Sequence, residues 1–85
     1  MELDLLYFAW VRERIGLDGE RVTLPPDVID VAGLVAWLAQ RSDGHGEALA
    51  DRGRLRAAVD QRFATPETSI IGAREVALFP PVTGG

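Results

Sequence analysis

The stretch ELDLLYFAW, residues 2–10, decides the fold of this 85-residue chain, because it predicts a strand with one buried face. Successive side chains of a strand point to opposite faces of the sheet. One face carries Leu3, Leu5 and Tyr7. The other face carries Asp4, Leu6 and Phe8. Because the charged Asp4 is expected to point to solvent, the second face is expected to be the outer one and the first face to cover the core.

The residues after this strand predict a hairpin with a loose connection. VRERI at 11–15 predicts a helical turn that ends at Gly16. Asp18-Gly19 predicts a turn into a second strand over residues 20–24, where apolar and polar residues alternate. Pro25-Pro26 is expected to stop that strand.

A helix is predicted over residues 31–41. Asp30 stands where an N-cap belongs. The following apolar residues have i, i+3, i+4, i+7 spacing, which gives one apolar stripe. They are Val31, Leu34, Val35 and Leu38. Ser42-Asp43-Gly44 is expected to end the helix, and residues 47–52 are expected to form another short helical turn.

Three further strands are predicted in the second half of the chain, over residues 54–60, 62–65 and 74–79. In the last strand Val76 and Leu78 share one face, and Ala77 and Phe79 share the other. The whole order predicts an α+β fold, in which one main helix packs on one face of a mixed sheet of about five strands.

Composition excludes several classes of protein. The chain carries nine arginines, no lysine and no cysteine, so it lacks a catalytic lysine, a cysteine nucleophile and zinc–thiolate sites. The net charge of −4 without a basic stripe argues against nucleic acid and suggests a basic protein partner. The sequence shows no membrane-length apolar run and no basic leader segment, so we expect no membrane partner and a cytoplasmic location.

The body of the chain shows no catalytic constellation. His45 lies in Gly44-His45-Gly46 and is expected to be an exposed loop residue without a role. No glycine-rich segment joins a strand to a helix, and no three residues suggest a metal site. The acidic residues are expected to cap helices or face solvent. We therefore expect a binding or carrier module rather than a self-contained enzyme.

The last six residues, 80–85, form a predicted tail after a domain that spans residues 1–79. Pro80 and Pro81 hold the chain extended, and the segment continues through Val82 and Thr83 to Gly84-Gly85. Six residues in this conformation reach about 19 Å. Glycines lack Cβ atoms, so they allow the backbone to enter a narrow tunnel in another protein. The group delivered there is the α-carboxylate of Gly85. The alternative is an ordinary flexible end of the chain.

Four apolar side chains are expected on the sheet face away from the helix, near the root of the tail. They are Leu6, Phe8, Ala77 and Phe79. If the first and last strands are neighbours, these side chains form a patch of the kind that marks a protein interface. Two alternatives are a register error of one residue and a patch covered by residues 11–15.

Three blocks of the sequence resemble the MoaD family, the small subunit of molybdopterin synthase. They are LYFAWVRERIG at 6–16, AAVDQ at 57–61 and EVALFPPVTGG at 75–85. The resemblance covers essentially the whole chain, and its most specific part is the FPPVTGG ending. Asp60 stands where the family more often has asparagine, and residues 40–54 match the family poorly.

The resemblance implies a ubiquitin-like β-grasp fold with the first and last strands adjacent and parallel. It implies a non-catalytic sulfur-carrier subunit with no bound cofactor. A ubiquitin-activating-like adenylyltransferase would use ATP to activate Gly85, which would become a thiocarboxylate. The large synthase subunit would then pass its sulfur to cyclic pyranopterin monophosphate within a heterotetramer. The implied partner interface comprises Leu6, Phe8, Arg12, Phe63 and Phe79.

Two other classes of function remain open from the sequence. A sulfur carrier of the thiamine pathway, or of another thiolation pathway, has the same architecture, and so does a ubiquitin-like protein modifier. A passive β-grasp interaction module would share the fold without any chemistry at Gly85. The Phe79-Pro80-Pro81 root favours the molybdopterin pathway among these.

Overall fold

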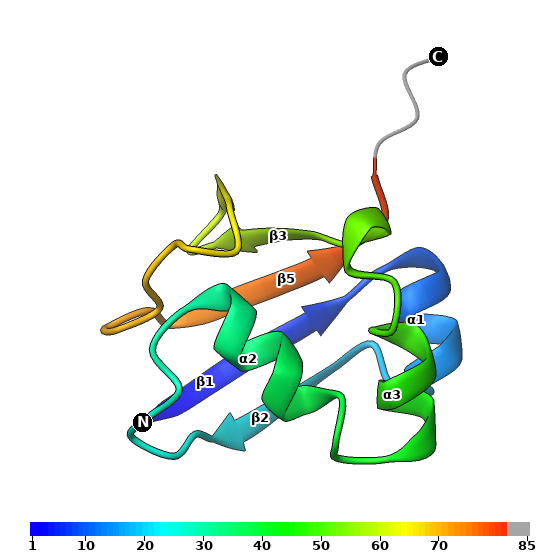
Figure 1. Ribbon diagram of the computed structural model, residues 1–85, viewed down its shortest axis with the longest axis horizontal. Helices are drawn as coiled ribbons and strands as arrows, with labels where there is room; N and C mark the ends of the chain where they lie inside the picture. Colours follow the sequence, from blue (N-terminus) through cyan, green and yellow to red (C-terminus); the bar gives the residue numbers. More distant parts are fainter. Residues whose placement is uncertain (82–85) are drawn as a thin grey trace.

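A computed structural model describes residues 1–81 and shows a five-stranded sheet with helices (Figure 1). The elements in chain order are β1 (Glu2–Tyr7), α1 (Ala9–Ile15), β2 (Gly19–Thr23), α2 (Val31–Leu38), α3 (Asp43–Ala48), η1 (Arg52–Arg54, a 3-10 turn), β3 (Arg56–Val59), β4 (Arg62–Ala64) and β5 (Glu75–Phe79). The predicted α+β class is confirmed. Within the described residues, no helix is long and apolar enough to span a bilayer.

The strands lie in the order β2-β1-β5-β3-β4. β1 and β5 are parallel neighbours, and the other three pairings are antiparallel. β5 therefore lies in the centre of the sheet, as the resemblance implies for the last strand of a β-grasp fold. The end of β1 and the end of β5 meet at one edge of the molecule, so α1 and the tail begin side by side (Figure 1).

One face of the sheet packs against α2 and forms the core. The predicted inward side chains of β1 and β5 are at most 1% exposed. They are Leu3, Leu5, Tyr7, Val76 and Leu78. The stripe on α2 is buried as predicted, and Asp30 caps the helix by accepting a hydrogen bond from the backbone N–H of Gly33 at 2.7 Å. The predicted strand parity is therefore correct for β1, but the strand ends at Tyr7 rather than at residue 10, and α1 begins at Ala9 rather than at residue 11.

The tight turn between β3 and β4 is built by Asp60 and Gln61, whose φ angles are +48° and +71°. Two consecutive left-handed residues match the right-handed twist of a hairpin, and aspartate tolerates this conformation well. The Asp60 carboxylate also accepts hydrogen bonds from the backbone N–H groups of Arg74 and Glu75, at 2.9 and 3.0 Å. Aspartate at this position therefore ties the hairpin to the start of β5.

The segment between α2 and β3 differs from the prediction. α2 ends at Leu38 rather than residue 41, and residues 43–48 form α3 instead of a loop. Ser42 is not a helix stop. It caps α3 by accepting a hydrogen bond from the backbone N–H of His45 at 3.1 Å. The turn predicted within 47–52 is replaced by the end of α3 and by η1, which begins at Arg52.

Gly44 allows α3 to pack closely against α1. A Cβ atom on Gly44 would lie 2.5 Å from the backbone oxygen of Arg14. This clash could be relieved only by moving the backbone of α1 or α3. We expect Gly44→Ala to lower the free energy of unfolding by about 1–3 kcal/mol, as overpacking does elsewhere. Urea denaturation measures this change. Gly53→Ala is the control, since its new Cβ would meet only an ordinary contact at 3.5 Å; equal stability of the two variants would contradict the close approach.

Candidate docking site at the root of the tail

The sheet face away from α2 carries a row of apolar side chains across four strands. Leu6 of β1 is paired with Ala77 of β5, Ala77 with Ala58 of β3, and Ala58 with Phe63 of β4. Paired residues point to the same side of a sheet. The row therefore forms one continuous surface, which with Phe8 and Phe79 is called the apolar face below.

The aromatic side chains of the apolar face lie at its tail-side edge. Phe63 is 84% exposed and Phe8 is 47% exposed, whereas Phe79 is half-buried. The rings of Phe63 and Phe79 are 6.0 Å apart between centroids and tilted by 58°, a favourable geometry for an aromatic pair. Phe8 donates its backbone N–H to the carbonyl of Leu78 at 3.2 Å, which places it beside the end of β5.

Helix α1 leaves this face open. Its residue Val11 is fully buried in the core formed with α2, so the helix packs toward the core side. The alternative that residues 11–15 cover the patch is therefore wrong, and the predicted exposure of this face is confirmed. Exposed aromatic side chains gathered on one sheet face are typical of a docking surface for another protein.

The tail begins at this face. β5 ends at Phe79, and Pro80 and Pro81 follow it as half-buried residues outside any strand. The predicted tail residues Val82, Thr83, Gly84 and Gly85 lie outside the described residues. The predicted reach of the tail and the role of Gly85 therefore stay predictions.

Arg12 is the one residue of the implied interface that is not on the apolar face. It lies on α1, the helix that begins directly after Phe8. Its side chain is exposed, and within residues 1–81 it forms no ion pair. Arg12 is thus available to a partner on the tail-side end of the molecule. Its docking role stays a prediction.

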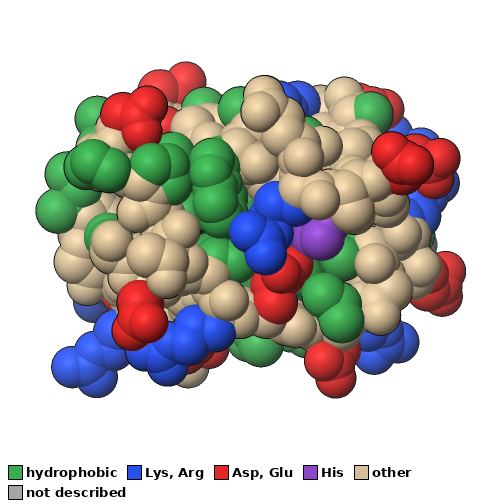
Figure 2. Space-filling model, turned by 90° about the horizontal axis from the view of Figure 1, so that it is seen from below, with side chains coloured by type: hydrophobic (Ala, Val, Ile, Leu, Met, Phe, Trp, Pro, Cys, Tyr) green, Lys and Arg blue, Asp and Glu red, His purple; other side chains and the backbone are tan. Residues whose placement is uncertain are grey.

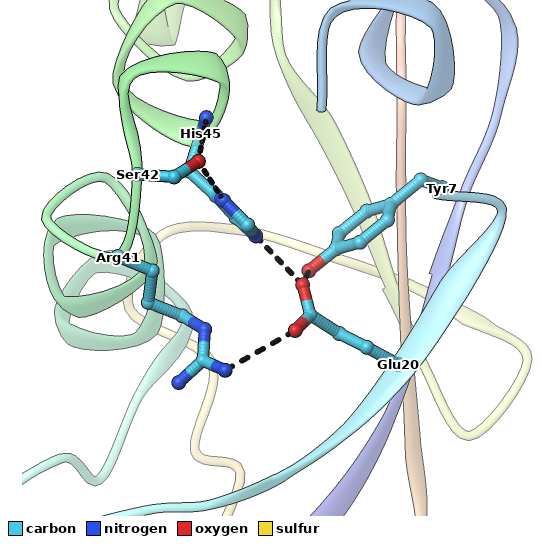
Figure 3. Close-up of polar contacts among 5 residues, drawn as sticks. All are labelled: Tyr7, Glu20, Arg41, Ser42 and His45. Carbon is cyan, nitrogen blue, oxygen red and sulfur yellow. Dashed lines mark hydrogen bonds and ion pairs between the residues drawn. The ribbon is translucent and has the colours of Figure 1, made fainter. Parts of the chain in front are cut away.

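His45 is not the exposed loop residue that its flanking glycines predicted. It lies in α3 and is only 6% exposed. Figure 2 shows the small part of its side chain that reaches the surface, beside a basic and an acidic side chain. Its Nε2 lies 2.6 Å from the Glu20 carboxylate, and its Nδ1 lies 2.6 Å from the Ser42 hydroxyl (Figure 3). Tyr7 presents its ring to the imidazole edge-on, with centroids 6.2 Å apart.

Glu20 is the centre of this network. One carboxylate oxygen accepts hydrogen bonds from His45 Nε2 and from the Tyr7 hydroxyl at 2.8 Å, and the other faces Arg41 at 3.3 Å (Figure 3). Burial alone would raise the pKa of the Glu20 carboxyl, but hydrogen bonds from His45 and Tyr7, with the charges of His45 and Arg41, outweigh burial and lower it. Burial and the bond to Glu20 raise the pKa of the Tyr7 hydroxyl.

The network joins α3 to β1 and β2, and every buried polar side-chain atom described within residues 1–81 has a partner. Its contacts join residues of the fold to one another, so the network has a structural role. No group of three His, Asp or Glu side chains within residues 1–81 could hold a metal ion. The apolar face is therefore the candidate functional surface.

A pH experiment tests the Glu20 network. A carboxyl whose pKa is lowered by folding stabilises the fold above its ordinary pKa of 4.5, and this contribution is lost as pH falls through the lower folded value. We expect Glu20→Gln to cost about 1–3 kcal/mol at pH 7 and less at pH 3, measured by urea denaturation. The exposed Glu67→Gln is the control, with little change at either pH. An equal loss for Glu20→Gln at both pH values would contradict the network.

Comparisons with known proteins give a consistent result over nearly the whole chain. The molybdopterin synthase sulfur carrier subunit of Haemophilus influenzae is 37% identical over 83 residues, covering 98% of this chain and 99% of that protein. The protein of the same name in Escherichia coli is 41% identical with the same coverage. The one in Mycosarcoma maydis is 33% identical over 85 residues, covering 95% of this chain and 90% of that protein.

Solved structures agree with the fold. The structure of SAMP1 from Haloferax volcanii has a TM-score of 0.73 at 24% identity and covers all of both chains. A putative molybdopterin converting factor, subunit 1, from Pyrococcus furiosus has a TM-score of 0.74 at 24% identity and covers 96% of this chain and 99% of that one. These likenesses confirm the ubiquitin-like β-grasp fold. The ThiS family model matches residues 5–85, and the chain therefore belongs to the ThiS family.

Proposed function

We propose that this protein is the sulfur-carrier small subunit of molybdopterin synthase. The observation that carries the proposal is the extent of the relationship: bacterial relatives of that name are 37–41% identical over 83 residues, and the family match runs to Gly85. The apolar face at the root of the tail supports it, because a carrier must dock on the protein that uses its terminal group. The chain is non-catalytic, and its partner supplies the catalytic groups.

The reactive group of the proposed carrier is the carboxylate of Gly85. A carboxylate is a poor electrophile, so a ubiquitin-activating-like adenylyltransferase joins it to AMP from ATP and releases pyrophosphate. Hydrosulfide then attacks the acyl carbon and displaces AMP, and loss of the S–H proton leaves a glycine thiocarboxylate. Its sulfur is a good nucleophile at neutral pH. Donation of that sulfur and hydrolysis return Gly85 to a carboxylate for another round.

The acceptor in this proposal is cyclic pyranopterin monophosphate, held by the large synthase subunit. Two sulfur transfers build the dithiolene of molybdopterin. The apolar face, with Phe63 and Phe79 at its tail-side edge, docks on the large subunit, while Gly84 and Gly85 enter that subunit because they lack side chains. Two small and two large subunits form a heterotetramer. These steps take place in the cytoplasm, where ATP is available.

The acceptor distinguishes this function from the other uses of a thiocarboxylate. The thiocarboxylated chain is mixed with cyclic pyranopterin monophosphate, with and without the large subunit encoded in the same genome. We expect molybdopterin to form, and Gly85 to return to a carboxylate, only when the large subunit is present. A thiocarboxylate that forms but yields no molybdopterin in this mixture would assign the chain to another thiolation pathway or to protein modification.

A further inference from the structure

Charge is distributed unevenly over this acidic protein, because two short segments are basic and the remainder is acidic. Residues 12–14 and 51–56 carry five arginines against two carboxylates, a net charge of +3. All other residues together carry four arginines against eleven carboxylates, a net charge of −7. The five arginines are Arg12, Arg14, Arg52, Arg54 and Arg56. They are called the arginine collar below.

The fold brings the two basic segments together. Trp10 of α1 has the guanidinium carbon of Arg14 at 4.9 Å and that of Arg54 at 6.0 Å from its ring centroid. These distances suit cation–π contacts, and they place α1 and η1 side by side. Arg56 follows at the start of β3, where its guanidinium donates to the backbone carbonyls of Gly53 and Leu55 at 2.9 and 3.0 Å.

The collar lies at the root of the tail. Arg56 is the strand partner of Phe79, the last residue of β5, and α1 starts directly after Phe8, which bonds to Leu78. All five arginines are exposed, and within residues 1–81 none of them forms an ion pair. Their charges are therefore accessible to a protein that binds at this end of the molecule.

The opposite end of β5 carries charges of both signs, because Asp4 pairs with Arg21 at 3.6 Å and Arg74 is next to Glu75. Asp4 is the partner of Glu75, the first residue of β5, and the Asp60 carboxylate binds the backbone of the same residue. The five residues of β5 span about 13 Å between their first and last Cα atoms. Salt screens charges over about 8 Å at physiological ionic strength. A partner at the tail root therefore experiences the collar arginines more strongly than the charged residues at the far end of β5.

We infer that the arginine collar docks on an acidic rim of the protein that receives the tail. Arginine suits this task because its planar guanidinium binds carboxylates through two parallel hydrogen bonds. Complementary charge at the rim of an interface accelerates association and orients the partners before the apolar contacts form. The net charge of the whole chain suggests a basic partner, but its local distribution at the tail root requires the opposite sign. The inference rests on the proposed function, which supplies the large synthase subunit as the receiving protein.

Association kinetics of the full-length chain with the large subunit test this inference. The variant Arg52→Gln/Arg54→Gln removes two charges from the collar. Arg62→Gln/Arg74→Gln is the matched control, because it removes two exposed charges from elsewhere that also form no ion pair within residues 1–81. At low salt we expect the collar variant to associate about five- to tenfold more slowly than the wild type and the control variant to change less than twofold. At high salt the difference should disappear, since the charges are screened.

The outcomes separate the collar from the proposed function. Normal association of the wild type, with equal rates for the collar and control variants at low salt, would overturn the collar alone. An increase in rate on removal of collar charges would also overturn it, because the receiving rim would then be basic. If the wild type fails to bind the large subunit at all, the proposed function is wrong and the collar loses its partner with it. Thermal unfolding of both variants checks that the fold is unchanged.

Discussion

Removal of Gly85 is expected to reduce sulfur transfer at least about 100-fold while leaving the fold intact. One residue shifts the reacting carbonyl by about 3 Å, and misplacement of a reacting group by even 1 Å costs on the order of 100-fold in rate. The same loss is expected when one glycine is added after Gly85. Transfer is measured with purified activating enzyme and large subunit, by the rate at which molybdopterin forms.

Stability supplies the control for both length variants. The described core draws no residue from beyond Leu78, so neither change removes a packed side chain. We therefore expect melting temperatures within about 1 °C of the wild type, since exposed changes far from the core alter stability little. Full transfer activity in either variant would mean that the position of the terminal carboxylate does not matter, and the carrier mechanism would be wrong.

Phe63→Ala is expected to weaken the complex with the large subunit about 30-fold, which corresponds to about 2 kcal/mol. An aromatic ring that is exposed in the free protein and buried at the centre of an interface often acts as a hot spot. Phe63 is 84% exposed and its ring pairs with that of Phe79 at the edge of the sheet, so its loss leaves no cavity in the free protein. Isothermal titration calorimetry measures the affinity, and the melting temperature should stay nearly unchanged.

Two variants make this test specific. Ile71→Ala removes another exposed apolar side chain, one that is 71% exposed and lies outside the apolar face, and it should leave the affinity unchanged. Leu78→Ala should lower the free energy of unfolding by about 2–5 kcal/mol, because Leu78 is fully buried. If Phe63→Ala and Ile71→Ala bind equally well, the apolar face is not the docking surface.

The sequence predicts well those parts of the fold that are determined by residues close together in the chain. The alternation in ELDLLYFAW determines which side chains of β1 enter the core, and the structure confirms it for residues 3–7. Asp30 caps α2, and Gly16 ends α1 with φ of +88°, where glycine has no Cβ penalty. Each of these features follows from local propensity within about four residues, so sequence patterns reveal it.

Helix α3 could not be predicted because its stability comes from distant residues. Its sequence DGHGEA contains two glycines, which are poor helix formers in isolation. Packing on α1 requires the missing Cβ of Gly44, and His45 is held by Glu20, which lies 25 positions earlier. The one local signal was Ser42 three residues before His45, a spacing typical of an N-cap.

The docking site was predictable in part. Strand parity placed Leu6, Phe8 and Phe79 away from the core, and the structure confirms that placement. The pairing of β1 with β5 joins residues far apart in the sequence. It was predicted from the family resemblance, because periodicity within a strand does not reveal which strands pair. Phe63 could not be oriented from the sequence, since β4 has only three residues. Its pairing with Ala58 determines its face.

The mass of the chain after incubation with ATP, a sulfur source and the activating enzyme shows directly whether Gly85 carries sulfur. We expect an ATP-dependent mass gain equal to the replacement of one oxygen by sulfur, and fragmentation should place it at Gly85. The chain without Gly85 serves as the matched control. If the full-length chain gains no sulfur while the same enzyme activates its own established carrier, or if sulfur appears elsewhere in the chain, Gly85 is not the sulfur-carrying group.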